Sequence, residues 1–139
     1  MNYNELEEIQ LQEIPKISDP DGRGNLSIIE KDFLPYKIKR VYYLYDVPSD
    51  SFRGGHAHIE LQQFLIALSG SFDVVLDDGS SRRTITLNRP NKGILIPNGI
   101  WRELENFSAG TVCLALVSDH FKEEDYIRNY NDFKSFKGT

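Results

Sequence analysis

The sequence predicts an all-β fold, a barrel or sandwich, with one α-helix at its C-terminal end. Short runs rich in β-branched and aromatic residues recur along the chain, and turn signals separate them at the spacing of about 8–12 residues that is typical of such folds. A helical period appears only near the end. With 139 residues the chain is long enough for a substantial core, and we expect residues 1–139 to form one domain.

The first half of the chain is expected to supply four strands, each marked by β-branched, aromatic or continuous apolar residues. Asp19-Pro-Asp-Gly-Arg-Gly24 is a turn between the first two, and Ser69-Gly70-Ser71 is a tight turn after the fourth. The expected strands cover residues 9–17 (with a break at Pro15), 25–30, 37–47 and 61–69.

The second half is expected to supply five more strands and the helix. Asp77-Asp-Gly79 is a strong hairpin signal. The helix is expected over 123–136, where apolar side chains recur at helical spacing, and Ser118 or Asp119 is expected to cap its start. The expected strands cover residues 72–76, 84–87, 93–96, 100–104 and 111–117.

Charge and composition exclude several classes of protein. The net charge of −5, with no long basic stripe, argues against a nucleic-acid binder. No apolar run approaches the roughly 20 residues of a membrane span. The acidic N-terminus lacks the basic and apolar regions of a signal peptide, so we expect a cytoplasmic protein. The single cysteine, Cys113, is expected to be a buried apolar residue.

Two of the three histidines, His56 and His58, stand two positions apart just before the apolar run 61–69. In a strand, such residues point to the same face, about 7 Å apart. We therefore expect both imidazoles to face one cavity, where they ligate a metal or transfer a proton. A role limited to core hydrogen bonds is the plainer alternative. The third histidine, His120, is expected at the surface.

The pattern resembles the cupin superfamily, and this resemblance implies an all-β cupin (jelly-roll) barrel with a C-terminal α-helix and an active site in the barrel mouth. The first cupin motif is Gly, five residues, His-x-His, three or four residues, Glu, six residues, Gly. The two histidines and Gly70 match it, and Gln63 replaces the Glu. The second motif, Pro-x-Gly-x-x-His-x-x-x-Asn, is kept over residues 97–106 with Arg102 in place of its His.

These two departures argue against a metal. A cupin metal needs about three histidines and a carboxylate, and a guanidinium stays protonated and repels a divalent ion. Glu60 is the one residue placed to compensate in part. We expect no metal and no cofactor, and the chain has no Gly-x-Gly-x-x-Gly motif. His56 and His58 are therefore interpreted as proton-transfer groups, because imidazole titrates near neutral pH.

Substrate contacts are expected from arginines and from polar or aromatic side chains near these motifs. Arg53 and Arg23 stand beside glycines and suit phosphate oxygens, although each also fits a surface turn. Arg102 is expected to hold phosphate or to stabilise an enolate oxygen. Among the tyrosines of the run 42–45, Tyr43 is expected to reach the site with its phenol. Gln63 is expected to contact substrate, and Trp101 either stacks on a base or, as we favour, packs the barrel.

Four segments together resemble one group of cupins, the sugar nucleotide 3,4-ketoisomerases that act on dTDP-4-keto-6-deoxyglucose. The last of them contains the distinctive pattern Asp-Tyr-Ile-Arg-x-Tyr-x-x-Phe (125–133), and together they span nearly the whole chain. The segments are Lys39-Arg-Val-Tyr-Tyr43, Arg53-Gly-Gly-His-Ala-His58, Val75-Leu-Asp-Asp-Gly79 and the run from Ser118 to Tyr130.

This resemblance implies a metal-free reaction that moves the carbonyl from C4 to C3, giving a 3-keto sugar for deoxyamino sugar biosynthesis. A neutral imidazole removes the acidic C3 proton, an enediol or enediolate forms, and C4 is protonated. His58 is slightly favoured as the base, with His56 as the relay, and Arg102 and Tyr43 orient or stabilise the oxyanion. The resemblance also implies a homodimer in which an N-terminal strand crosses to the partner. Arg23 is therefore expected in the site of its own chain or in that of its partner.

Three other functions remain open at this point. A metal-dependent cupin such as a dioxygenase would carry about one metal ion per chain. A dTDP-sugar 3,5-epimerase would exchange deuterium at C3 and C5 and leave the carbonyl at C4. A non-catalytic nucleotide-sugar binding module would bind the ligand and exchange nothing.

Overall fold

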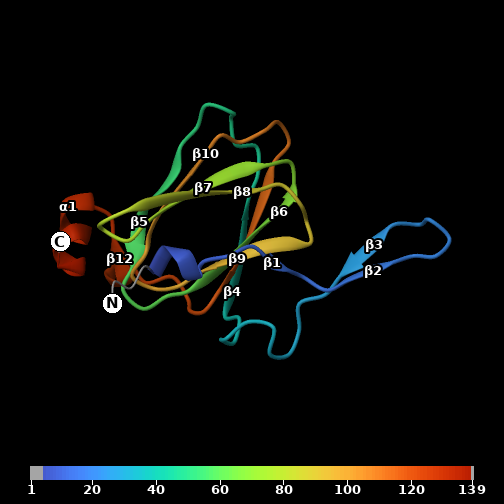
Figure 1. Ribbon diagram of the computed structural model, residues 1–139, viewed down its shortest axis with the longest axis horizontal. Helices are drawn as coiled ribbons and strands as arrows, with labels where there is room; N and C mark the ends of the chain where they lie inside the picture. Colours follow the sequence, from blue (N-terminus) through green and yellow to red (C-terminus); the bar gives the residue numbers. More distant parts are fainter. Residues whose placement is uncertain (1–4, 139) are drawn as a thin grey trace.

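Antiparallel strands are the main regular structure of the computed structural model, which describes residues 5–138 (Figure 1). One five-stranded sheet has the order β1-β9-β6-β11-β4, the second has the order β12-β5-β10-β7-β8, and β2 and β3 form a separate hairpin. The expected all-β fold is confirmed. The first sheet comprises β1 (Gln12–Glu13), β9 (Lys92–Ile96), β6 (Gln63–Ser69), β11 (Val112–Val117) and β4 (Arg40–Leu44). The second comprises β12 (Tyr126–Ile127), β5 (Arg53–His58), β10 (Trp101–Glu105), β7 (Phe72–Asp77) and β8 (Arg82–Leu87).

The main core lies between the two five-stranded sheets. Leu65 and Ala67 of β6 belong to the same buried cluster as Phe72 and Leu76 of β7. The alternate residues of β6 are also buried, because Phe64 packs on the other face of its sheet under the loop that carries Leu34. This explains the continuous apolar run of β6, since a strand covered on both faces needs no polar alternation.

The expected strands after residue 60 all form, and the two turn signals lie where the sequence places them. Gly70 has φ 73° in the turn between β6 and β7. The Asp78 amide donates to the Ser81 carbonyl across the turn between β7 and β8, and Gly79 has φ 95° there. Glycine adopts these left-handed conformations without steric penalty, so both turns follow from local sequence.

The C-terminal segment differs from the expected helix over 123–136. A short 3₁₀ helix (Glu123–Asp125) and β12 come first, and α1 covers only Tyr130–Lys137. Asn129, and neither Ser118 nor Asp119, caps α1 by accepting from the Asp132 amide at 3.0 Å. The expected start was wrong because long-range pairing outweighs local period: Tyr126 and Ile127 pair with β5.

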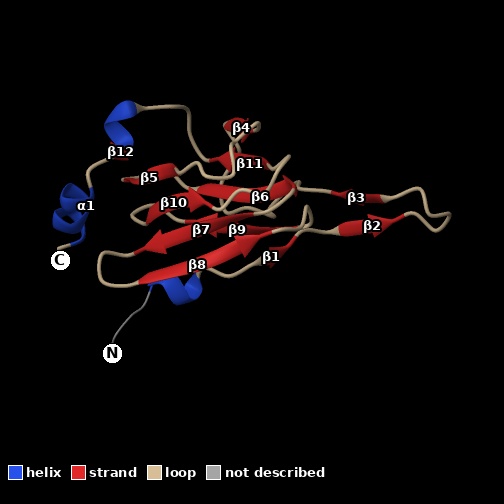
Figure 2. Cartoon of the chain, turned by 90° about the horizontal axis from the view of Figure 1, so that it is seen from above, coloured by secondary structure: helices blue, strands red, loops and turns tan. Residues whose placement is uncertain are grey.

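The N-terminal region forms two pieces in place of one strand. The chain breaks at Pro15 between β1 and β2 (Lys16–Ser18), as expected, and β2 then pairs with β3 (Asn25–Ser27). Figures 1 and 2 show this hairpin projecting from the body of the molecule at the end opposite α1. Its apolar side chains are open to solvent, with Ile17 56% and Leu26 58% exposed.

None of the helices in residues 5–138 has the length and apolar character needed to cross a membrane. The helical segments are short and lie at the periphery of the strands (Figure 2).

Candidate active site

The two histidines of β5 lie side by side inside the barrel. Their ring centroids are 4.8 Å apart, His58 is 2% exposed, and His56 is half-buried. Gly54 and Gly55 precede them with φ of 94° and 66°, at an irregularity in the pairing of β5 with β10. A β-carbon at Gly54 would lie 3.0 Å from the Arg102 carbonyl oxygen. The glycines therefore let β5 approach β10 and direct both imidazoles inward, as the sequence predicts.

A small pocket of about 70 Å³ opens beside this pair. The predicted residues His56, Arg53, Gln63 and Arg102 line it together with Tyr42. These five residues come from four strands of both sheets. The pocket thus brings together four of the eight predicted site residues, and a fifth, His58, lies against His56 without lining the pocket itself. Apolar side chains of β4, β6, β10 and β11 complete the lining: Leu44, Leu65, Leu104 and Cys113.

Arg102 is a fully buried cation beside the histidines. It is 1% exposed and pairs across the strands with His56. Its guanidinium donates to the Ile100 carbonyl at 2.9 Å and to the side-chain oxygen of Gln63, whose amide donates to the Tyr42 hydroxyl at 2.9 Å. Burial lowers the pKa of Arg102 to about 10, so it stays charged at neutral pH. Because these partners are uncharged, the site is prepared for an anion.

Both imidazoles are held in the neutral form. Burial, followed by the charge of Arg102, lowers the pKa of His56 and of His58 to about 3, from an ordinary value of 6.5. Arg40 and Arg128 act on His58 in the same direction. A neutral imidazole has a free lone pair, so each ring is able to accept a proton in the resting state.

These shifts predict a stability that falls in acid. At pH 6.5 and below the unfolded chain protonates both histidines, while the native state keeps them neutral until about pH 3. The unfolded state then binds more protons, so the free energy of unfolding should decrease as the pH falls through this window. Urea titrations between pH 7.5 and pH 4.5 measure the slope. The double variant His56→Asn/His58→Asn should have a shallower slope, and His120→Asn, at an exposed position, should not; equal slopes in all three proteins would contradict the account.

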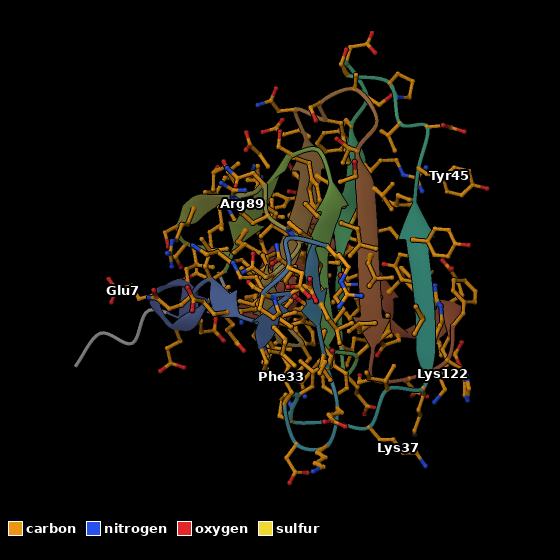
Figure 3. All side chains as sticks on the ribbon, turned by 90° about the vertical axis from the view of Figure 1, so that its right-hand side faces the viewer. Glu7, Phe33, Lys37, Tyr45, Arg89 and Lys122 are labelled. Carbon is orange, nitrogen blue, oxygen red and sulfur yellow. The ribbon has the colours of Figure 1, made fainter. Side chains whose placement is uncertain are left out.

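Two predicted site residues lie elsewhere. Tyr43 is 59% exposed on the outer face of β4, where its ring lies 5.8 Å from that of Tyr45 at a tilt of 34°. Figure 3 shows Tyr45 projecting away from the sheets. Alternation along β4 turns Tyr42 inward instead, so the prediction that the Tyr43 phenol reaches the site is wrong. Trp101 does not face the pocket, because its neighbour Arg102 does. It packs against α1, 5.6 Å from Phe133, and so belongs to the cluster under the helix and not to the barrel core that we favoured for it.

The two substrate arginines have different positions. Arg53 is the first residue of β5 and lines the pocket. Arg23 lies at the tip of the projecting hairpin, where it pairs with Asp19 at 2.8 Å, and its side chain is 77% exposed. Figure 1 shows that hairpin at one end of the molecule and β12, the neighbour of β5, toward the other, so the fold does not bring Arg23 to the histidines of its own chain.

Three residues of the site were not foreseen. Tyr42 lines the pocket, the Asp125 carboxylate lies 3.1 Å from Nδ1 of His58, and the Tyr126 ring packs 4.4 Å from His58. Alternation places Tyr42 and Tyr43 on opposite faces of their strand, but it does not say which face meets the core. Asp125 belongs to the distinctive C-terminal pattern, but only the pairing of β12 with β5 brings it to the histidines.

The residues present do not fit the metal of a metal-dependent cupin. Gln63 and Arg102 bind each other where a carboxylate and a third imidazole would be needed. Glu60 is exposed, and its backbone amide donates to Asp125. Within residues 5–138 no group of three or more His, Cys, Asp or Glu side chains is arranged to hold a metal ion.

Comparison with known proteins identifies the family. The family model described as WxcM-like, C-terminal (FdtA) matches residues 7–138. A curated relative, the TDP-4-oxo-6-deoxy-α-D-glucose-3,4-oxoisomerase of Aneurinibacillus thermoaerophilus, is 44% identical over 117 residues, which cover 84% of each chain. The chain belongs to this family of sugar 3,4-ketoisomerases. The resemblance seen in the sequence is thereby confirmed.

Solved structures of ketoisomerases have the same fold. A 3,4-ketoisomerase from Helicobacter canadensis is 41% identical, with a TM-score of 0.90 over 95% of this chain and 98% of that one. A histidine-to-asparagine variant of QdtA from Thermoanaerobacterium thermosaccharolyticum, in complex with TDP-4-keto-6-deoxyglucose, is 38% identical, with a TM-score of 0.88 over 99% and 96%. A dTDP-4-dehydrorhamnose 3,5-epimerase from Bacillus anthracis, at 15% identity and a TM-score of 0.76 over 89% and 79%, shares the fold alone.

Proposed function

We propose that this ketoisomerase moves the carbonyl of dTDP-4-keto-6-deoxy-D-glucose from C4 to C3 and so forms a dTDP-3-keto-6-deoxyhexose. One observation carries the proposal: a buried and a half-buried imidazole, both with a lowered pKa, lie beside a buried guanidinium that donates to an amide oxygen and a backbone carbonyl, both uncharged. This arrangement suits removal of a proton from carbon and stabilisation of the oxyanion that results. The named activity and ligand of the relatives support the same substrate class.

The chemistry follows from the acidity of the substrate. The C3 hydrogen is acidic because it lies next to the C4 ketone, and a neutral imidazole of His58 accepts it. The electron pair moves into a C3–C4 enediolate, whose negative charge develops beside Arg102. The His58 imidazolium exchanges its proton with solvent and then protonates C4, which returns His58 to its neutral form. Proton transfer from the C3 hydroxyl to the C4 oxygen through His56 completes the shift. No net oxidation occurs, so no redox cofactor enters the balance.

Polar residues around Arg102 assist in this scheme. Gln63 holds both Arg102 and the Tyr42 hydroxyl, so one amide fixes the cation and the phenol together. Burial raises the pKa of Tyr42, so its phenol stays protonated and donates a hydrogen bond to a sugar oxygen. Tyr42, and not Tyr43, is therefore the phenol that orients or stabilises the oxyanion in this scheme. Arg53, which lines the pocket and is exposed, is assigned to the diphosphate.

A direct conversion assay tests this function. The purified protein is incubated with dTDP-4-keto-6-deoxyglucose, and the sugar carbons are followed by NMR. The proposal expects the carbonyl signal to move from C4 to C3. A metal-dependent enzyme would convert the sugar only after a metal ion is added, and a binding module would leave the sugar unchanged. Either result would contradict the proposal. A 3-keto sugar is the form that an aminotransferase consumes in making a 3-amino sugar.

We also propose that the active enzyme is a homodimer in which Arg23 serves the site of the partner. An isolated two-stranded hairpin is marginally stable in water, and the β2–β3 hairpin projects with its apolar side chains exposed (Figure 1). A second copy of the chain would cover them. The Arg23 guanidinium would then bind a substrate phosphate across the interface.

Mixing two impaired variants tests this exchange. The Arg23→Gln chain has intact histidines, and the His58→Asn chain has an intact Arg23. In a mixed dimer, the barrel of the Arg23→Gln chain therefore receives the hairpin of the His58→Asn chain, and this site is complete. Refolding an equal mixture should restore about a quarter of wild-type activity, because half of the dimers are mixed and each has one complete site. Each variant refolded alone is the control. A mixture no more active than the average of the two alone would place Arg23 outside the partner's site.

A further inference from the structure

The Asp125 carboxylate is held from several directions next to His58. It is the last residue of the 3₁₀ helix that precedes β12. One of its oxygens lies 3.1 Å from Nδ1 of His58, and the backbone amides of Glu60 and Leu61 donate to the same carboxylate at 2.8 and 3.2 Å. Its own carbonyl accepts from the Ile59 amide at 2.9 Å. The carboxylate is therefore fixed to the turn that directly follows His58.

This contact determines where the imidazole carries its hydrogen. An ionised carboxylate only accepts hydrogen bonds, so a neutral His58 that bonds to it must be protonated on Nδ1. The other nitrogen, Nε2, then keeps its lone pair. The ring has no room to turn over, because it is 2% exposed and lies against the rings of His56 and Tyr126 at 4.8 and 4.4 Å.

We propose that Asp125 is a positioning residue that fixes the tautomer of His58, so that Nε2 is the atom that removes the substrate proton. The proposal rests on the function assigned above, in which His58 is the base. It extends that function by naming the reacting atom and the group that selects it. Asp125 itself acts through His58 and makes no contact with the substrate in this account.

The charges around His58 give the carboxylate a second effect. Three guanidiniums disfavour the protonated ring: Arg102 on β10, Arg40 on β4, and Arg128 just after β12. His58 nevertheless becomes an imidazolium each time it accepts the C3 proton. Asp125 is the carboxylate in direct contact with that cation, so it stabilises the charged ring while the proton is held. Burial, followed by the guanidiniums, keeps the base neutral before reaction, and Asp125 allows it to protonate during reaction.

Asp125→Asn is the informative variant, because it keeps the size of the side chain and removes its charge. The Glu60 amide makes the shorter of the two backbone bonds, to Oδ1, so that position should keep the oxygen and the NH₂ group should take the position of Oδ2, which faces His58. The Leu61 amide, which donates to Oδ2 at 3.2 Å, then loses its acceptor. That NH₂ group donates a hydrogen bond, which Nδ1 can accept only when Nδ1 carries no hydrogen. The ring hydrogen therefore moves to Nε2. Nε2 then carries a hydrogen and has no lone pair with which to remove the substrate proton. We expect kcat to fall roughly 10- to 100-fold, with KM and dTDP affinity within about twofold of wild type, as for a misoriented base with an intact binding site.

The tautomer can be observed directly by ¹⁵N NMR of the His58 ring at neutral pH. Wild type should show a protonated Nδ1 and an unprotonated Nε2, and Asp125→Asn should show the reverse. Asp119→Asn is the matched control: it removes a carboxylate in the same segment whose partner is Lys122 at 2.8 Å, and it should keep the wild-type tautomer and kcat. Asp125→Glu, which retains a carboxylate, should restore part of kcat.

Two results would overturn the proposal. One is a wild-type spectrum with the hydrogen on Nε2 of His58, and this result decides the matter even if Asp125→Asn fails to fold. The other is a folded Asp125→Asn protein with the wild-type tautomer and undiminished kcat. A wild-type protein that binds dTDP-4-keto-6-deoxyglucose without converting it would instead refute the proposed function, and the tautomer measurement does not depend on that conversion.

Discussion

His58→Asn is expected to lower kcat for carbonyl migration by roughly 1,000- to 10,000-fold, the upper range for loss of a general base. The amide of Asn can still donate to Asp125, as Nδ1 of His58 is positioned to do at 3.1 Å, so the local fold should persist. An amide does not accept a proton at neutral pH, so the C3 hydrogen remains in place. Steady-state kinetics with dTDP-4-keto-6-deoxyglucose measure the loss, and calorimetry should show dTDP affinity within about twofold of wild type.

The matched comparisons are His56→Asn and His120→Asn. His56→Asn should also lose a large factor in kcat, because His56 serves the proton transfer between the oxygens. His120 is exposed and lies outside the pocket, so His120→Asn should keep wild-type kinetics. Full activity in both His56→Asn and His58→Asn would disprove the assignment of the pair as proton-transfer groups.

Arg102→Met is expected to lower kcat by roughly 100- to 1,000-fold, the range for removal of one oxyanion-stabilising donor. Methionine has a length similar to that of arginine and carries no charge, so the enediolate would develop in a buried pocket without its cation. The substrate ketone is neutral in the ground state, so KM should change much less than kcat. The measurement is kcat and KM by direct product quantification in NMR time courses.

Arg102→Lys separates charge from shape. Lysine keeps a cation near the same place but loses the fork that bonds Gln63 and Ile100 together. It should retain clearly more activity than Arg102→Met. Equal losses in the two variants would show that the fork and not the charge matters, and full activity in Arg102→Met would remove Arg102 from the catalytic scheme.

The central part of the site is visible in the sequence because each of its features is local. A strand period of two places His56 and His58 on one face, and the paired glycines before them allow the close approach of β10. The frame of the two cupin motifs places Gln63 and Arg102 beside the histidines, and the structure joins these two by a hydrogen bond. Strand spacing is sufficient to predict the histidine pair, and the resemblance to the cupin motifs predicts the two residues beside it.

The parts that the sequence does not reveal depend on contacts between distant segments. Tyr126 and Ile127 fit a helical period, but pairing with β5 makes them a strand, and Asp125 reaches His58 only as a consequence. The choice between Tyr42 and Tyr43 depends on which face of β4 meets the core, and a run of tyrosines carries no alternation signal. The position of Arg23 depends on the direction of a hairpin that contacts solvent in this chain.

The most direct test of the central claim is to run the reaction in D₂O and locate deuterium and the carbonyl in the product by NMR. Proton transfer between C3 and C4 predicts a carbonyl at C3, deuterium at C4 of the product and none at C5, with this labelling abolished on the time scale of the assay in His58→Asn. Deuterium at C5 with the carbonyl still at C4 would identify an epimerase instead. No carbonyl movement and no deuterium at any sugar carbon would contradict catalysis by this site altogether.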